Sequence, residues 1–454
     1  MAETRSTGGE DAGSKRWTAV LSGATARSAA SAGEDVAERL RDTERVRACA
    51  EAAARQTTLP AAVRWRPHDV AQGDTGLALF CGHLNSCAPG RGWDRAAHGY
   101  LASAARGAEQ AGRLPPSLFG GLGGLAFAAW FLSDDGTRYR RLRGELDRRL
   151  LPEAVRRGRA AAGAAPGCSV GVFDAISGLA GTGACLLGRR DEPAAAEALR
   201  AVLAGLVALC GEHDGLPHWH TPPAVMADPS MARQFPGGNL NCGLAHGIPG
   251  PLALMALALS AGVAVDGQRE AVRSVADWLT AQRCDDAWGP NWPSAVALPD
   301  ASGTAPDATP ARSAWCYGAP GLARALWLAG RALGDGRLCS LAVEAMAAVF
   351  RRPREHRGIP SPSFCHGVAG LLQVTLRFAH DTADPLFVHA ATELTEQLLE
   401  MYAPERPLGY CSIEPGGTRV DQPGLLDGAP GVALALLAAA TDVPPAWDRL
   451  FLLS

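Results

Sequence analysis

Runs of apolar residues recur along the chain, and each run begins with the pattern Gly-x-x-Gly. The runs are apolar on nearly every face of the helix that they would form, which predicts helices buried on all sides. The second glycines of successive patterns lie 48 to 71 residues apart. The seven patterns begin at Gly73, Gly121, Gly178, Gly247, Gly318, Gly367 and Gly428.

A second, more charged segment follows the apolar run, as in residues 192–210 and 267–283. Charge on one face of such a segment predicts an outer helix that exposes that face to solvent. No pair of helices can bury its own apolar surface, whereas seven pairs closed into a ring can. The pattern therefore predicts an all-α toroid of seven inner and seven outer helices, with loop or small strand insertions.

Glycine and proline indicate how each inner helix begins. Glycine permits a tight turn with positive φ and lets neighbouring backbone approach closely. Proline precedes the second glycine at Pro249, Pro320 and Pro430, where the first turn of a helix tolerates a missing N–H. We expect all seven turns at one end of the ring, so that the side chains just before them converge on a central opening.

The whole chain has 454 residues, more than a single core usually holds, but a closed ring is an allowed exception. We expect one toroidal domain over residues 36–454. Residues 1–35 are expected to form a disordered tail, since the first fifteen are polar and rich in Gly and Ser. The segments 211–240 and 284–311 are interpreted as loops over the mouth of the ring and as candidates for substrate contact.

The amino-acid composition favours a helical globular protein and argues against a nucleic-acid-binding or membrane-spanning one. The chain is 47% apolar and 20% charged, as in ordinary globular proteins, and its few aromatic residues and many alanines favour helices. A net charge of -3 argues against a nucleic-acid-binding protein. The longest apolar stretch, residues 251–265, is too short to span a bilayer, and no secretory signal is visible. We therefore expect a cytoplasmic protein without a membrane span.

Twelve cysteines are scattered through the chain, and most are expected to be buried, reduced side chains. Cys316 lies just before the fifth pattern, and Cys365 and His366 lie just before the sixth. Two cysteines and a histidine form one of the three-ligand sets that leave zinc an open fourth position. These turns contain no obvious fourth ligand. We therefore expect one Zn²⁺ per chain.

The motifs AHGIPG, WCYGAPG and CHGVAG, in this order within a sevenfold Gly-x-x-Gly chain, resemble the lanthionine synthetase C family. The resemblance covers roughly residues 70–440. It implies an α/α-toroid that closes thioether rings in peptides whose Ser and Thr are already dehydrated. It also implies that Cys316, Cys365 and His366 are the zinc ligands.

The same resemblance assigns further residues to the active site. His246 matches a general acid or base, Asp174 an active-site aspartate and Arg312 an active-site arginine. Tyr317 lies in the same motif as Cys316. The implied reaction adds a peptide cysteine thiol to dehydroalanine or dehydrobutyrine. None of these site residues departs from the family's pattern, and the second repeat and the N-terminal tail match it most loosely.

The resemblance also implies partners. These are a dehydrated precursor peptide, a separate dehydratase and, in a complex at the membrane periphery, a transporter. Two alternatives stay open: a relative that adds glutathione to dehydrated residues, and a zinc-holding interaction module without turnover.

Overall fold

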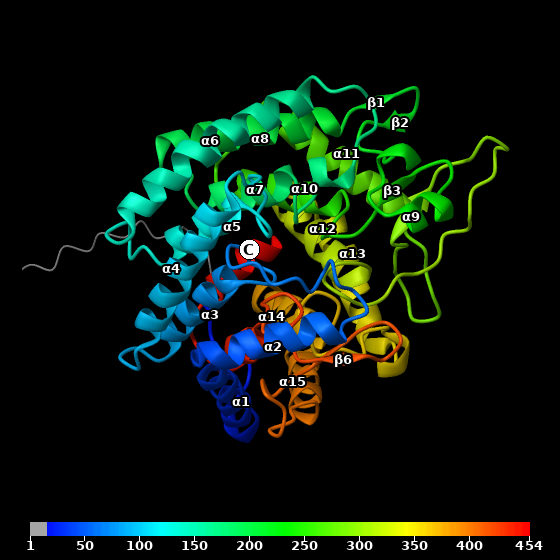
Figure 1. Cartoon of the computed structure of the whole chain (residues 1–454). Helices are drawn as coiled ribbons and strands as arrows, with labels where there is room; N and C mark the ends of the chain where they lie inside the picture. Colours follow the sequence, from blue (N-terminus) through cyan, green and yellow to red (C-terminus); the bar gives the residue numbers. More distant parts are fainter. Residues whose placement is uncertain (1–15) are drawn as a thin grey trace, which may run out of the picture.

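Seven almost wholly buried helices form an inner ring in the computed structural model, which describes residues 16–454 (Figure 1). Each inner helix begins at one of the seven Gly-x-x-Gly patterns, and proline stands in the first turn of three of them. The predicted all-α toroid is confirmed. The inner helices are α3 (Asp74–Cys87), α5 (Leu122–Phe131), α7 (Leu179–Leu187), α10 (Pro249–Ser260), α12 (Ala319–Leu333), α14 (Val368–Thr382) and α16 (Ala429–Ala440).

Amphipathic helices surround this ring, and six of them follow an inner helix in the chain. They bury one face and expose charge on the other, as the sequence pattern predicted. These outer helices are α4 (Trp93–Ala111), α6 (Arg140–Ala162), α8 (Pro193–Leu209), α11 (Gln268–Ala281), α13 (Gly336–Arg351) and α15 (Pro385–Glu400).

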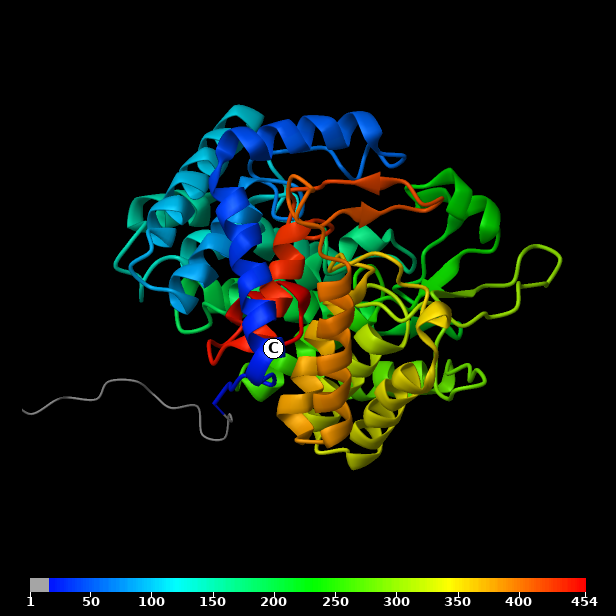
Figure 2. The ribbon, with the colours of Figure 1, turned by 90° about the horizontal axis from the view of Figure 1, so that it is seen from below.

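The seventh outer helix comes from the other end of the chain. α1 (Gly23–Arg41) packs along α16 and closes the ring, and Figure 2 shows the two helices side by side. Val36 and Leu40 on α1 are fully buried. The predicted disordered tail over residues 1–35 is therefore wrong from Trp17 onward, because Trp17 and Leu21 are also buried and Trp17 donates to the carbonyl of Ala438 over 3.1 Å. Its first fifteen residues lie outside the described part of the chain. The apolar stripe of α1 consists largely of alanine, which is why the sequence pattern did not reveal it.

A circle of backbone hydrogen bonds joins the seven turns at one end of the ring. Each bond runs from the N–H of a residue two or three positions before one pattern to a carbonyl in the next turn, over 2.7–3.3 Å. The seventh turn bonds back to the first, so the circle holds sequence-distant residues at one mouth. The bonds run Val70→Phe119, Phe119→Ile176, Ala175→Ala245, Ala245→Cys316, Cys316→Cys365, Cys365→Leu426 and Leu426→Ala71.

A buried apolar residue stands three positions before every pattern, and its carbonyl lies close to the second glycine. A Cβ atom added at Gly370 would lie 1.9 Å from the oxygen of Phe364, and one at Gly321 would lie 2.1 Å from that of Trp315. Of the fourteen pattern glycines, Gly318 alone has a positive φ, of 94°. The expected positive-φ turn is therefore wrong elsewhere, and close backbone approach explains the glycines. The seven buried residues are Val70, Leu118, Ala175, Leu244, Trp315, Phe364 and Leu425.

The C-terminal segment fills the centre of the ring. Figure 1 places the C-terminus at the middle of the molecule, and the 3-10 helix η4 (Ala446–Phe451) buries Trp447 and Phe451 completely. Asp448 on this segment accepts hydrogen bonds from Gln373 and Arg377 of α14, over 2.7 and 2.6 Å. The inner helices therefore enclose a packed core rather than a channel.

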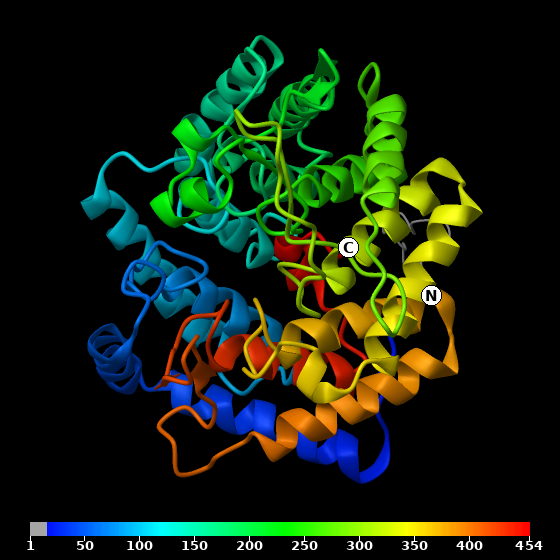
Figure 3. The same cartoon turned by 90° about the vertical axis from the view of Figure 1, so that its right-hand side faces the viewer.

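Inserted segments lie on one side of the ring, and this side faces the viewer in Figure 3. The segments 211–240 and 284–311 are joined by a short antiparallel sheet of β3 (Asn239–Asn241) and β4 (Ala295–Ala297), in which Leu240 pairs with Val296. Two further two-stranded antiparallel sheets occur in the described chain. Their strands are β1 (Glu212–His213), β2 (Leu216–Pro217), β5 (Ser412–Ile413) and β6 (Arg419–Val420).

The remaining described elements are short or peripheral. They are α2 (Thr43–Gln56), α9 (Pro229–Gln234) and the 3-10 helices η1 (Val170–Val172), η2 (Pro223–Val225) and η3 (Arg354–His356). All twelve cysteines are free thiols, as expected for a chain without a disulfide scaffold. Among residues 16–454, no helix combines the length and the apolar character that crossing a bilayer requires.

Candidate functional site

Four reactive side chains occupy the same place in four consecutive turns, directly before the first glycine of the pattern. They are His246, Tyr317, His366 and Asp427. Since the backbone circle holds these turns in register, equivalent positions in neighbouring turns meet at the mouth of the ring. The same position in the first three turns carries Gln72, Gly120 and Ser177.

The two predicted metal-binding cysteines lie one residue earlier in their turns. The backbone N–H of Cys316 donates to the carbonyl of Cys365 over 3.2 Å, and the nearby Cys316 thiol raises the pKa of the Cys365 thiol. The circle of backbone bonds is thus the direct reason why these two side chains, 49 residues apart in sequence, are neighbours.

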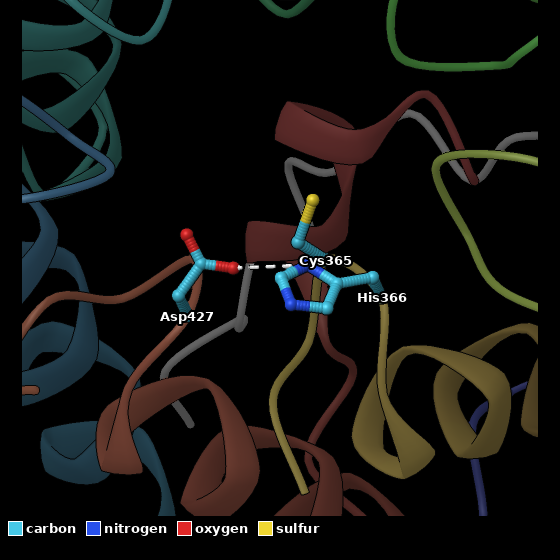
Figure 4. A group of neighbouring side chains, drawn as sticks. All are labelled: Cys365, His366 and Asp427. Atoms are coloured by element: carbon cyan, nitrogen blue, oxygen red, sulfur yellow. Dashed lines mark ion pairs between the residues drawn. The ribbon is translucent and has the colours of Figure 1, made fainter. Parts of the chain in front are cut away.

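The tightest group of metal-binding side chains differs from the predicted set. Cys365, His366 and Asp427 place one potential ligand atom each within 4.8 Å of one another (Figure 4). His366 Nδ1 lies 3.4 Å from Oδ1 of Asp427. Cys316 is outside this group, although its thiol is near enough to raise the pKa of Cys365. The structure therefore brings the predicted residues to one place and adds a carboxylate to them.

The electrostatics of the group favour a cation. The hydrogen bond to Cys316, together with burial, raises the pKa of the Cys365 thiol well above its ordinary value. Two adjacent buried thiols cannot both ionise unless a positive charge compensates them. Asp427 Oδ1 is buried and has no hydrogen-bond partner, a state that costs free energy unless something such as an ion occupies the space beside it. Thiolate, imidazole and carboxylate donors are those that zinc accepts, so these residues fit a zinc ion.

A histidine–aspartate pair lies in the neighbouring turns. His246 Nδ1 is 2.7 Å from Oδ2 of Asp174, and Asp174 is almost fully buried whereas the imidazole is 41% exposed. The other oxygen of Asp174 accepts the backbone N–H groups of Ser177 and Gly178 over 2.6 and 2.7 Å. A carboxylate in this position holds the proton on Nδ1 and leaves Nε2 of the neutral ring as a proton acceptor at the mouth.

Tyr317 contacts the insertion that ends in β3. Its hydroxyl accepts a hydrogen bond from the Asn241 amide over 3.2 Å, and Asn241 Oδ1 accepts the N–H of Gly243 over 3.0 Å. Burial, helped by the charges of the nearby cysteines, raises the pKa of Tyr317 to about 12. The phenol therefore stays protonated near neutral pH and can donate a hydrogen bond.

Arg312 stands at the edge of the site. Its side chain is exposed, and its backbone carbonyl lies so close to Gly318 that a Cβ there would be 1.7 Å from the oxygen. Its positive charge lowers the pKa of Cys365 and so opposes the larger influences of Cys316 and burial. The guanidinium is thus near enough to the thiols to act on charge that develops beside them.

Two residues of the site were not predicted from the sequence, Asp427 and Asn241. The expectation that no fourth ligand accompanies the predicted set considered the turns that carry cysteine or histidine, and Asp427 belongs to the seventh turn. It is brought beside the sixth turn by the bond from Cys365 N–H to the carbonyl of Leu426, 3.0 Å long. Its position directly before Gly428, equivalent to that of His366, was a signal that could have revealed it.

The chain matches the family model described as Lanthionine synthetase C-like protein over residues 64–452. It belongs to this family. The resemblance inferred from the three motifs is thereby confirmed. The lanthionine synthetase C-like match begins after α1 and α2, so the helix that closes the ring lies outside it.

Two comparisons with individual proteins agree with the membership. The chain is 25% identical over 305 residues to "Nisin biosynthesis protein NisC" of Lactococcus lactis subsp. lactis, a match that covers 66% of this chain and 71% of the relative. A solved structure named "Nisin cyclase" superposes with a TM-score of 0.72 at 22% identity, covering 86% of this chain and 93% of that one. This second likeness supports the toroidal fold.

Proposed function

We propose that this lanthionine synthetase C-like protein is a zinc-dependent cyclase of dehydrated peptides. It would add peptide cysteine thiols to dehydroalanine or dehydrobutyrine and so form lanthionine or methyllanthionine rings. The observation that carries the proposal is the convergence of the Cys316–Cys365–His366 turns with the His246–Asp174 pair at one mouth. The similarity to a protein named for nisin biosynthesis supports the same reaction class.

Cys316, Cys365 and His366 would hold the metal in this proposal. A zinc ion bound there would lower the pKa of an incoming thiol, so that the peptide cysteine reacts as a thiolate. Two thiolate ligands offset the charge of the ion, which lets the substrate sulfur keep more of its nucleophilicity than three neutral histidines would. The hydrogen bond and burial that raise the pKa of Cys365 are overcome by the same positive charge.

The remaining side chains transfer the proton of the thiol and stabilise the negative charge that develops on the enolate. The reaction removes a proton from the thiol and adds one at the α-carbon of the dehydrated residue, so no net proton is consumed. His246, with Nδ1 held by Asp174, presents Nε2 for these proton transfers. Arg312 stabilises the enolate that forms when sulfur attacks the β-carbon, and protonated Tyr317 supplies a further donor.

The proposed setting follows from this reaction. A separate dehydratase must act first, because the substrate already contains dehydrated Ser or Thr. The dehydrated precursor peptide is then the direct partner of the mouth of the ring. We place this work in the cytoplasm, with a transporter as a further partner of the biosynthetic complex.

The test combines metal analysis with a cyclisation assay. Ring closure leaves the mass of the peptide unchanged, so free thiols are counted by N-ethylmaleimide labelling before and after incubation with dehydrated precursor. We expect one zinc per wild-type chain, loss of zinc and of ring closure in Cys316→Ala, and retained zinc without turnover in His246→Ala. A wild-type protein without zinc, or a His246→Ala variant that cyclises normally, would overturn the assignments. A parallel reaction with glutathione distinguishes intramolecular closure from glutathione addition.

A further inference from the structure

The carboxylate of Asp427 is placed toward the metal-binding side chains without a partner of its own. Oδ1 is buried, lies 3.4 Å from His366 Nδ1 and has no hydrogen bond among the described residues. Figure 4 shows that the carboxylate approaches the edge of the imidazole that carries Nδ1, and that the Cys365 side chain stands above this edge with its sulfur pointing away from the ring. Three donor atoms therefore surround one small volume.

The separation of 3.4 Å between nitrogen and oxygen distinguishes two roles for Asp427. An N–H···O hydrogen bond to His366 would be about 2.7–3.2 Å long, so this contact is longer than a normal one. Two ligands of a tetrahedral zinc ion, with bonds of about 2.0–2.2 Å, are separated by about 3.3–3.5 Å. The spacing suits two ligands of one metal, and the buried, unpartnered Oδ1 is consistent with that role.

The backbone and a neighbouring side chain hold Asp427 in this place. The Ser412 hydroxyl donates to its carbonyl, and the N–H of Cys365 donates to the preceding carbonyl of Leu426 over 3.0 Å. Gln72, at the equivalent position of the first turn, donates its amide to Gln422 over 2.8 Å, and its nearness lowers the pKa of the Asp427 carboxyl. Oδ1 itself has no hydrogen-bond partner, so this oxygen is available as a ligand.

We propose that Asp427 is a fourth ligand of the metal, which binds through Oδ1 and closes the coordination shell of Cys316, Cys365 and His366 until a peptide thiolate displaces it. This inference rests on the proposed function, since it concerns the same ion. The exchange replaces one anionic ligand by another, so the charge of the site stays constant. The proton of the incoming thiol leaves to solvent or to His246, and no covalent bond of the protein changes.

The test compares Asp427→Asn with Asp427→Glu and with Asp421→Asn as the matched control. Asp421 lies six residues earlier, is also partly buried and forms an ion pair with Arg406 over 3.0 Å, outside the metal-binding group. Zinc affinity is measured by competition with a chelator. The Co²⁺-loaded proteins are then titrated with N-acetylcysteine methyl ester, and the sulfur-to-cobalt absorption band reports binding of the thiol.

We expect Asp427→Asn to bind zinc about 10–100-fold more weakly than the wild type and the thiol about tenfold more tightly, because a neutral amide competes poorly for the ion. Asp427→Glu should retain most of the zinc affinity, and Asp421→Asn should match the wild type. Zinc and thiol affinities of Asp427→Asn within twofold of the wild type would overturn the inference.

The outcomes separate this inference from the proposed function. A wild-type protein that binds no zinc would refute the function itself, whereas equal zinc binding and normal ring closure in Asp427→Asn would refute only the role of Asp427. If Asp427→Asn does not fold, as judged by circular dichroism, Asp427→Glu decides the question. A longer carboxylate ligand must shift the ligand-field bands of Co²⁺, and unchanged bands would exclude Asp427 from the coordination shell.

Discussion

Two aspartates at equivalent positions show how partners determine what a carboxylate does. Asp69 and Asp174 each stand four residues before a pattern glycine, and Oδ1 of each accepts two backbone N–H groups of its own turn. Asp174 additionally pairs with His246 at 2.7 Å. Burial raises the pKa of Asp69 to about 6, against the backbone hydrogen bonds that lower it. Asp174 thus holds a partly exposed histidine, whereas Asp69 is a buried group with a cost at neutral pH.

Substitutions of Asp174 separate its two roles. Asparagine keeps an oxygen for the N–H groups of Ser177 and Gly178 but cannot hold a charged imidazole, so ring closure should slow by about 10²–10⁴-fold with little change in stability. Alanine removes both contacts and should also lower the free energy of unfolding by about 1–2 kcal/mol. The measurements are the cyclisation rate and urea denaturation. Wild-type turnover in Asp174→Asn would refute its role beside His246.

Asp69 predicts a pH dependence of stability. Since the fold raises its pKa from 3.8 to about 6, folding favours the protonated acid. Its stabilising contribution is complete below pH 3.8 and is lost as the pH rises through 6. Asp69→Asn does not titrate, so its stability relative to the wild type should increase by about 1–2 kcal/mol between pH 5 and pH 7.5. Chemical denaturation at both pH values tests this, and a pH-independent difference would contradict it.

At the scale of a single element, each turn is a compact unit of three parts. A buried apolar residue anchors it three positions before the pattern, two residues of variable type follow, and two glycines let the backbone fold back closely. Trp315 and Phe364 are the anchors of the two turns that carry the cysteines, and both are fully buried. The unit explains why reactive residues can vary at the mouth while the same turn is kept seven times.

The second glycine is the most restrictive part of this unit. Gly370→Ala would place a Cβ 1.9 Å from the Phe364 carbonyl and must shift the backbone of the sixth turn. We expect a loss of about 2–4 kcal/mol in the free energy of unfolding, together with weaker zinc binding by the adjacent Cys365 and His366. Gly144→Ala is the control, because a Cβ at this place on α6 meets nothing within 4 Å. It should be neutral or stabilising by up to about 1 kcal/mol, and similar behaviour of the two variants would contradict the packing argument.

In the molecule as a whole, the two ends of the chain complete the ring. α1 covers α16 from outside, and the C-terminal segment packs beneath the turns that carry Cys316 and Cys365. The ring of Phe451 lies 5.1 Å from that of Trp315 and 3.9 Å from that of Phe364, between centroids. The residues next to these two aromatic side chains are Cys316 and Cys365. The C-terminus therefore supports the site, although it lies far from it in sequence.

Phe451→Ala tests this support. Removing a fully buried aromatic ring should lower the free energy of unfolding by about 3–5 kcal/mol. The cavity lies under both cysteines, so zinc affinity should also fall. Val388→Ala on the partly exposed outer face of α15 is the control and should cost less than about 0.5 kcal/mol. Chelator competition and thermal unfolding give the two readouts, and unchanged zinc affinity in a folded Phe451→Ala protein would refute the link.

The sequence by itself was sufficient to predict the inner ring of helices. A helix that is apolar on every face is stable only in the interior of the protein. Seven such helices, each preceded by a glycine turn, can all be buried if the helix pairs close into a ring. Cys316, Cys365 and His366 could be selected as a set because they stand at the same turns of that repeat. His246, Asp174, Arg312 and Tyr317 were identified through the family resemblance, and their roles stay predictions.

Tertiary structure alone decided which parts of the chain meet across the ring. The role of α1 as the seventh outer helix depends on α16, at the other end of the sequence. The alanine-rich stripe of α1 is too weakly apolar to predict a buried helix face from the local sequence. Asp427 joins His366 because backbone bonds hold the sixth turn against the seventh, and Asn241 reaches Tyr317 through an insertion. The local sequence pattern predicts whether a side chain is buried. Which residues become its neighbours depends on how the ring closes, and therefore on contacts between residues far apart in the chain.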